Sequence, residues 1–301
     1  MKNICLLCAV LVCKMASAEI VAPDDEMHRG RVLVWNDEFN GSELDTLKWE
    51  FRVTMGSKDR IYADDSRTYR FEKGCLRLMA KPTGDVAKPY ILPHGLATHN
   101  TMNYRYGYLE MRARVPFLPG AWPSFWLQSP ERGRSVDWMT ETDVFEVFSN
   151  TNQFETALHK WGNRKHASCP GSLMDGGRYY TFENRPNLNE EFHVYGYEWA
   201  EHEMKFYVDG KCHCAIKLDD AHDFTTEDGG LVGMGGFRDP QAIIVNNELF
   251  TPGSTWKVND GILTADCGIQ VDYWIDYIRL WQRPNSKERI TYNLAKGGNL
   301  P

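Results

Sequence analysis

The most regular feature of the chain is the alternation of apolar and polar residues in short runs, which begins at about residue 32. In the segment 106–115, Tyr, Glu and Arg occupy every second position, a period of two that is typical of a half-buried β-strand. Comparable segments are 154–161, 192–199, 203–208, 241–246 and 269–281. Turn residues separate these runs, including an Asp209-Gly210 hairpin signal, and none has convincing helical periodicity. The pattern therefore predicts an all-β chain folded as a sandwich or jelly roll.

The segment Met139–Phe148 carries three carboxylates, at Glu141, Asp143 and Glu146, among apolar and β-branched residues. Because side chains alternate between the two faces of a strand, Glu141 and Asp143 share a face while Glu146 is one residue out of phase. A β-bulge adds one residue, which restores the phase and brings all three acids to the same face. The residues that then turn toward a core are Thr142, Val144 and Val147.

Three neighbouring acids repel one another when all are ionised, so at least one is expected to hold a proton at neutral pH. A retaining glycosidase needs one protonated and one ionised carboxyl, held about 5 to 5.5 Å apart. With the bulge, the Cα atoms of Glu141 and Glu146 are expected roughly 13 Å apart, which two glutamate side chains leaning together can largely close. The alternative for this spacing of acids is an amphipathic strand with a solvated acidic face.

The motif Glu141-Thr-Asp143-Val-Phe-Glu146 resembles the bulged catalytic motif of glycoside hydrolase family 16, which includes laminarinases, agarases, porphyranases and κ-carrageenases. Four further segments are similar to the family and follow in its order: 34–41, 106–116, 120–127 and 271–281. The resemblance implies a concanavalin-like β-jelly-roll sandwich of two curved antiparallel sheets, with a substrate cleft on the concave face. It also implies that Glu141 is the nucleophile, that Glu146 is the general acid/base, and that Asp143 orients the nucleophile and tunes both pKa values.

Several other residues are candidates for binding a sugar, since indole rings stack on sugars and polar groups bond to hydroxyls. They are Trp122, Trp126, Trp138, His159, Trp161, Arg67, Arg70, Arg164 and Asn246. Each has a structural alternative: core packing for the tryptophans, a satisfied core histidine, exposed arginines, and a turn asparagine at a strand end. The resemblance favours Trp122 and Trp126, which lie in the family's cleft segment, and His159, on the strand after the motif.

Composition narrows the class of partner. Aromatic residues make up 13% of the chain, more than a core needs, and the formal net charge is −7. Nucleic-acid binding needs a basic surface, so we expect a polysaccharide partner and no nucleic acid. The densest basic cluster, Lys160, Arg164, Lys165 and His166, could hold a sulfate or carboxylate if it overhangs a cleft; the alternative is a solvated loop. The substrate stays open between a β-1,3- or β-1,4-linked glucan and a red-algal galactan. The segment 239–250 resembles the galactan-degrading branches of the family more than the laminarinases, and this resemblance favours the galactan.

The first 18 residues are typical of a secretory signal peptide, with Lys2, an apolar run over 4–13 and a small-residue cleavage site that ends at Ala18. We therefore expect a secreted or periplasmic protein with a single catalytic domain over 19–285 and a surface tail over 286–301. The apolar run is too short to span a bilayer, and nothing else in the sequence is long enough, so we expect no membrane span. We also expect a monomer.

Five cysteines follow the signal peptide, an odd number that cannot pair completely. We expect most of them to be free thiols, and Cys75 with Cys267 is the pair to test for a disulfide. No cofactor is required for the chemistry. By resemblance, Asp276 matches a carboxylate that binds a structural calcium in some family members, although the further oxygen ligands that calcium needs are not evident in the sequence.

Together these features predict an endo-acting retaining glycoside hydrolase that cleaves internal β-linkages by double displacement. Two alternatives stay open. A lectin-like binding module would keep the aromatic residues without needing paired acids, and a transglycosylase would pass the same intermediate to a sugar.

Overall fold

A computed structural model of the chain describes ten stretches of it: residues 20–52, 60–130, 137–148, 152–162, 165–183, 190–218, 223–226, 231–233, 236–250 and 268–292. The regular structure of these residues is nearly all strand, with one 3-10 turn at Gly171–Leu173 (η1). None of the described helical segments is long and apolar enough to cross a bilayer. The expectations for the signal peptide, Arg164 and Cys267 lie outside the described residues.

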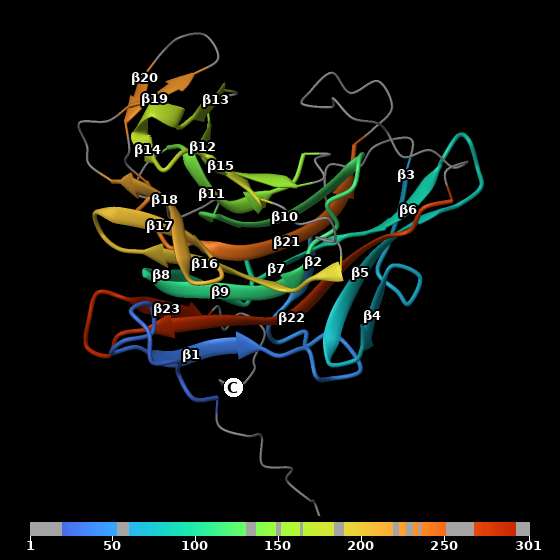
Figure 1. Cartoon of the computed structure of the whole chain (residues 1–301), viewed down its shortest axis with the longest axis horizontal. Coiled ribbons are helices and arrows are strands. Elements are labelled where there is room, and N and C mark those ends of the chain that lie inside the picture. The colour runs from blue at the N-terminus through green and yellow to red at the C-terminus, as the bar shows by residue number, and fades with distance from the viewer. Residues whose placement is uncertain are drawn as a thin grey trace, which may run out of the picture.

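Two large sheets make up the fold (Figure 1). The back sheet has 11 strands, in the order β14 (Met174–Asp175), β18 (Lys211–Lys217), β17 (Glu203–Val208), β16 (His193–Trp199), β9 (Gly107–Arg114), β22 (Val271–Gln282), β5 (Cys75–Pro82), β6 (Tyr90–Pro93) and β3 (Arg60–Ala63), with β1 (Val32–Asp37) beside β22 and β4 (Tyr69–Glu72) beside β5. The site sheet has 10 strands, in the order β2 (Glu50–Arg52), β7 (Gly95–Ala97), β21 (Ala242–Leu249), β10 (Ala121–Gln128), β11 (Met139–Glu146), β12 (Gln153–Gly162), β13 (Lys165–Ser168), β19 (Asp223–Thr226) and β20 (Leu231–Gly233), with β15 (Tyr179–Thr181) beside β12.

The two sheets pack face to face around one apolar core, as the alternation in the sequence predicts. The core includes Leu109 and Met111 from the back sheet and Phe125 and Phe145 from the site sheet, all fully buried. The ring centroids of Phe145 and Tyr195 are only 4.5 Å apart across the two layers. Burial of this kind is the main stabilising term in a sandwich, so the polar residues of the site sheet are left for its outer face.

The predicted strands are present, with ends that differ by a few residues. The segment predicted over 203–208 coincides with β17, and the one over 241–246 extends to Leu249 in β21. The hairpin turn after β17 is confirmed, because Asp209 (φ 49°) and Gly210 (φ 76°) are both in the left-handed region. That conformation matches the twist of a two-residue hairpin and favours Gly at its second position.

Two expectations need correction. The predicted tail over 286–301 includes a strand, β23 (Arg289–Tyr292), which pairs with β8 (Met102–Arg105); Ile290 and Tyr292 pack on the core. Hydrophobic residues at alternate positions give the segment a reason to fold back. Cys75 is a free buried thiol, as expected for most of the cysteines, so the candidate pair with Cys267 is not formed. Its sulfur lies beside the carboxylate of Asp276, 3.9 Å away.

Candidate active site

The predicted bulge is present in β11. Asp143 pairs with Ala157 of β12 and Glu146 pairs with Glu155, so two residues on β11 face one residue on β12. The ladder with β10 shifts at the same place, because Phe125 pairs with Phe145 while Trp126 pairs with Asp143. A β-bulge increases the local twist and redirects side chains, which is what the spacing of the acids requires.

The bulge sorts the side chains of β11 between two faces. Val144 and Phe145 enter the core, with exposures of 2% and 0%. Glu141 and Glu146 are half-buried on the outer face of the site sheet, which we call the site face. Asp143 lies between them and is buried, with an exposure of 1%. The charges of the three acids act on one another, so they form one electrostatic cluster.

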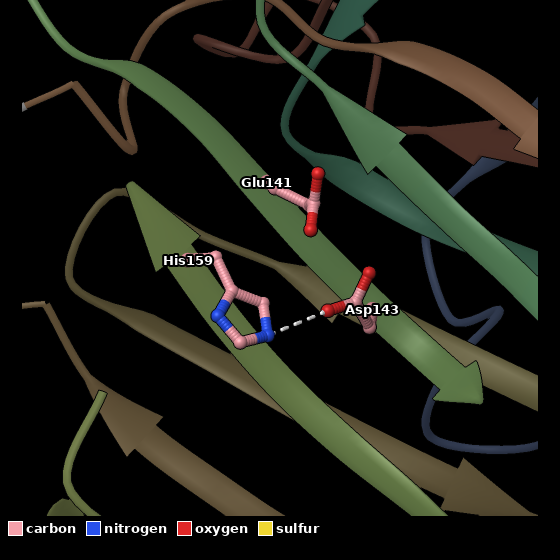
Figure 2. A group of neighbouring side chains, drawn as sticks. All are labelled: Glu141, Asp143 and His159. Carbon is pink, nitrogen blue, oxygen red and sulfur yellow. Dashed lines mark ion pairs between the residues drawn. The ribbon is translucent and has the colours of Figure 1, made fainter. Parts of the chain in front are cut away.

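His159 lies on the neighbouring strand, β12, opposite Glu141. Its Nε2 lies 3.3 Å from Oδ2 of Asp143, and Figure 2 shows both side chains with Glu141 on the same face. One ligand atom each of Glu141, Asp143 and His159 lies within 4.8 Å of the others, a group that could surround a cation. Calcium requires six to eight oxygen ligands, and a closed zinc site requires a fourth ligand. Three donors, two of them already paired with each other, suit proton exchange better than metal binding.

Burial and the charge of Asp143 together raise the pKa of Glu141 to about 8, while His159 opposes the shift. Burial and the charge of Asp143 likewise raise the pKa of Glu146 to about 8. Both glutamates therefore compete for protons at neutral pH instead of ionising together. A site with this electrostatic balance can hold one carboxyl protonated as an acid while another stays ionised as a nucleophile.

Each glutamate accepts a hydrogen bond from a neighbouring side chain. Nε1 of Trp122 donates to Oε1 of Glu146 at 3.0 Å, and the Trp122 ring stacks on Phe250 with centroids 5.2 Å apart. Nε2 of Gln128 donates to Oε2 of Glu141 at 3.5 Å, and Trp161 acts to lower the pKa of that acid. These bonds hold the two carboxyls in place on opposite ends of the cluster, because hydrogen bonding to a carboxylate both orients and stabilises it.

Trp126, from the same strand as Trp122, is held from two sides. Its Nε1 donates to Oδ1 of Asn246 at 2.8 Å, and the guanidinium of Arg52 lies over its ring, 4.7 Å from the centroid. Asn246 is buried, so it positions the indole and does not present its amide to solvent. Gly95 makes room for it, because a Cβ at that position would fall 2.4 Å from Nδ2 of Asn246.

The structure does not bring every predicted residue to this group. Trp138 packs against the core. Arg67, in the turn before β4, pairs with Asp65, and the side chain of Arg70, on β4 of the back sheet, donates to the carbonyl of Ser66. The expectation for these two arginines fails because the segment that carries them joins the opposite sheet.

The basic cluster is also divided. Lys160 lies on the side of β12 opposite His159 and is buried, with an exposure of 2%. Burial lowers its pKa to about 8, and the charge of Asp239 opposes that shift. A residue next to His159 in a strand must point the other way, so Lys160 cannot reach a ligand on the site face. His166 of the same cluster does lie on the site side, with its ring stacked on Trp161 at 3.9 Å between centroids.

Asp276 does not fit a calcium site. Its carboxylate forms an ion pair with Arg112, and the guanidinium of Arg114 lies over the nearby ring of Trp274. A hard cation needs several oxygen donors, and this surface instead supplies arginines, so the guanidinium of Arg112 takes the place that a cation would occupy.

Three residues near the acids were missed by the sequence analysis: Arg52, Gln128 and Ser168. Gln128 had a signal, since it continues the alternation from Trp122 through Trp126 and pairs with Glu141 in the ladder between β10 and β11. Arg52 had none, because strand β2 is three residues long and approaches the site only through the order of strands in the folded sheet.

Comparison with known proteins gives a consistent family. Residues 50–233, more than half of the chain, match the family model described as glycosyl hydrolases family 16. The chain is 27% identical to a glucan endo-1,3-beta-glucosidase of Niallia circulans over 64% of its own length and 30% of that protein. It is 22% identical to a keratan-sulfate endo-1,4-beta-galactosidase of Sphingobacterium multivorum, over 90% of this chain and 58% of that protein. The chain thus spans less than two thirds of either relative.

A solved structure agrees with the fold over nearly its whole length. It belongs to work on endo-acting O-glycanases that prominent members of the human gut microbiota express to initiate mucin breakdown. The TM-score is 0.66 with 28% identity, and the match covers 87% of this chain and 94% of the solved one.

Proposed function

The chain belongs to glycosyl hydrolase family 16, and from this membership together with the geometry of β11 we propose that it is an endo-acting retaining β-glycanase. The observation that carries the proposal is the bulge, which puts Glu141 and Glu146 on one face with buried Asp143 between them. Burial raises the pKa of both glutamates to about 8, so protons stay within the cluster at neutral pH. A surface that only holds sugar would have no need for this costly arrangement.

The reactive state is the one in which Glu141 is ionised and Glu146 protonated, and because the pKa of both acids is about 8, this state is populated as the pH approaches that value. In the first step, Glu141 in this state attacks the anomeric carbon while Glu146 gives its proton to the leaving oxygen. The glycosidic bond breaks and a glycosyl ester forms on Glu141. Trp122 donates to Glu146 and thereby fixes the direction of its carboxyl. Asp143 is paired with His159, and its negative charge repels ionised glutamates on either side. That repulsion disfavours the state in which both glutamates are ionised.

In the second step, Glu146 is left ionised and removes a proton from water, whose oxygen then attacks the anomeric carbon. The ester bond to Glu141 breaks and the sugar leaves with its original configuration. The same intermediate could pass to a sugar hydroxyl, which would make the protein a transglycosylase. The hydrolase is favoured here because both curated relatives are named as hydrolytic glycosidases.

The proposed substrate is a β-linked polysaccharide, either a galactan of the agarose, porphyran or carrageenan type or a β-1,3(4)-glucan of the laminarin type. Arg52 supports a substrate that carries a negative charge, such as a sulfated galactan. Its guanidinium lies over the ring of Trp126 and is attracted by the charge of Glu141. This guanidinium makes no hydrogen bond or ion pair with any described residue. An arginine fork matches sulfate and carboxylate in geometry and charge. We further propose secretion through residues 1–18 and a monomeric protein.

Release of reducing ends tests the function. Wild type, Glu141→Gln and Glu146→Gln are incubated with laminarin, lichenan, agarose, porphyran, carrageenan and keratan sulfate, and the anomeric form of the first product is followed by NMR. The proposal expects internal cleavage of at least one polymer with retention, and loss of nearly all turnover in both variants. Binding without cleavage on every polymer would overturn it in favour of a lectin-like module.

A further inference from the structure

His166 and His159 are in direct contact behind the acids, on neighbouring strands β13 and β12. Nε2 of His166 lies 2.9 Å from Nδ1 of His159, and Nε2 of His159 lies 3.3 Å from Oδ2 of Asp143. The three groups therefore form a chain from the middle carboxylate of the cluster to the ring of His166. Oγ of Ser168 is the other neighbour of Nδ1 of His159, at 3.0 Å.

The protonation of His159 depends on which neighbour faces its Nδ1. A neutral imidazole carries one proton, so it donates at one nitrogen and accepts at the other. If His159 is to donate from Nε2 to the Asp143 carboxylate, its Nδ1 must accept a hydrogen bond. Nε2 of His166, when it carries a proton, supplies that bond. The hydroxyl of Ser168 can either donate to Nδ1 or accept from it, so Ser168 alone does not fix the tautomer.

The other tautomer would disturb the acids. With its proton on Nδ1, His159 would donate to Oγ of Ser168 and present a lone pair from Nε2 to Asp143. Two acceptors 3.3 Å apart repel, unless Asp143 takes up a proton. Asp143 would then lose the negative charge that raises the pKa values of Glu141 and Glu146.

We propose that His166 is a positioning residue that fixes the tautomer of His159 by donating to its Nδ1, so that Asp143 stays an ionised acceptor beside the two glutamates. This inference rests on the proposed function. The stack on Trp161, with ring planes 18° apart, holds the His166 ring in the direction that this bond requires. Among the described residues, the acids whose charges act with His159 are Glu141, Asp143 and Glu146 of β11.

Two substitutions of His166 separate the bond from the stack. His166→Phe keeps a ring against Trp161 and removes the donor, and we expect kcat to fall about 10- to 100-fold, a part of what a positioned proton transfer contributes, with KM changed less than about 3-fold. His166→Gln removes the ring and keeps an amide donor, so it should retain most of kcat. The matched control is His202→Gln, because His202 lies exposed in the turn between β16 and β17.

A double variant tests whether the tautomer of His159 is the cause of the loss in kcat. Adding Ser168→Ala to His166→Phe removes the acceptor that favours the wrong tautomer, so it should recover part of the lost kcat. Nitrogen NMR of histidine-labelled protein reads the tautomer without any activity: the proton of His159 should sit on Nε2 in wild type and move to Nδ1 in His166→Phe. An unchanged tautomer in that variant, or equal losses in the Phe and Gln variants, would overturn the inference. Absence of cleavage by wild type would instead count against the proposed function.

Discussion

The indole N–H of Trp122 donates a hydrogen bond to the carboxyl of Glu146, with 3.0 Å between Nε1 and Oε1. This bond favours the ionised form of Glu146, because a carboxylate accepts a hydrogen bond better than a neutral carboxyl does. It acts against burial and against the charge of Asp143, which together raise the pKa of Glu146 to about 8. The pKa of the proposed acid is thus adjusted by a residue that lies beside it on the site face.

Trp122→Phe should move the alkaline limb of the pH profile of kcat/KM upward by about one pH unit. The loss of a hydrogen bond to a charged group, worth about 1.5 to 3 kcal/mol, raises the pKa of Glu146, and one pKa unit corresponds to about 1.4 kcal/mol. Because the acid must be protonated to act, activity should persist to higher pH. The phenyl ring keeps an aromatic contact with Phe250. Trp126→Phe is the comparison: its indole bonds to Asn246, so KM should rise while the limb stays in place.

Glu141→Gln should stabilise the protein, and more so at pH 8 than at pH 5. The folded protein holds the proton of Glu141 up to a pKa of about 8, whereas the unfolded chain releases it near 4.5. Between these values the folded state binds more protons, so the stability of wild type falls as pH rises. Glutamine cannot ionise and escapes this loss. Thermal unfolding of wild type and Glu141→Gln at both pH values measures the difference in Tm. Glu43→Gln is the control, because Glu43 is exposed. An equal Tm difference at pH 5 and pH 8 would contradict the burial of the carboxyl.

Local pattern was sufficient to predict much of the fold and the three acids. The period of two predicted both ends of strand β17 correctly. The spacing of Glu141 and Glu146 predicted a bulge, which is present in the ladder between β11 and β12. Both depend only on neighbours in sequence, because side-chain direction in a strand is fixed by parity. The same alternation could have excluded Lys160 from the proposed sulfate-binding cluster. Lys160 is adjacent to His159 in the strand, so the two side chains must point to opposite faces.

Contacts set by strand order could not be predicted in the same way. Arg52 and Trp126 are far apart in sequence, and they meet because β2, β7, β21 and β10 lie side by side in the site sheet. Arg70 was placed wrongly for the same reason, since its strand β4 joins the back sheet through β5. Asp276 was a candidate for a structural calcium by resemblance alone, and only the folded chain brings Arg112 to its carboxylate.

Gly95→Ala should raise KM and lower stability together. The new Cβ would fall 2.4 Å from Nδ2 of Asn246, closer than side chains pack, so Asn246 must move and its bond to the indole of Trp126 is lost. Overpacking of this kind costs about 1 to 3 kcal/mol. Gly171→Ala is the matched control, because the nearest atom to its Cβ would be Nε of Arg178 at 3.7 Å, an ordinary contact. Unchanged Tm and KM in Gly95→Ala would show that the region around Trp126 is looser than this contact indicates.

Arg52→Gln should reduce cleavage of charged polymers more than that of their neutral counterparts. Keratan sulfate against its desulfated form tests sulfate on a galactan, and carboxymethyl curdlan against curdlan tests a carboxylate on a β-1,3-glucan. If Arg52 binds the substituent through a charge-assisted bond worth about 1.5 to 3 kcal/mol, kcat/KM on the charged member should fall about 10- to 100-fold. The neutral member should change less than about 3-fold, because glutamine can still bond to a hydroxyl.

Arg70→Gln is the control for that comparison, since Arg70 is exposed on the back sheet and its change leaves the site untouched. Equal losses of Arg52→Gln on charged and neutral polymers would mean that the guanidinium serves as a counter-ion for Glu141 and Glu248, whose charges it feels. Arg52→Lys separates these roles further. A lysine retains the charge but lacks the planar fork, so it should preserve a counter-ion and lose the preference for sulfate.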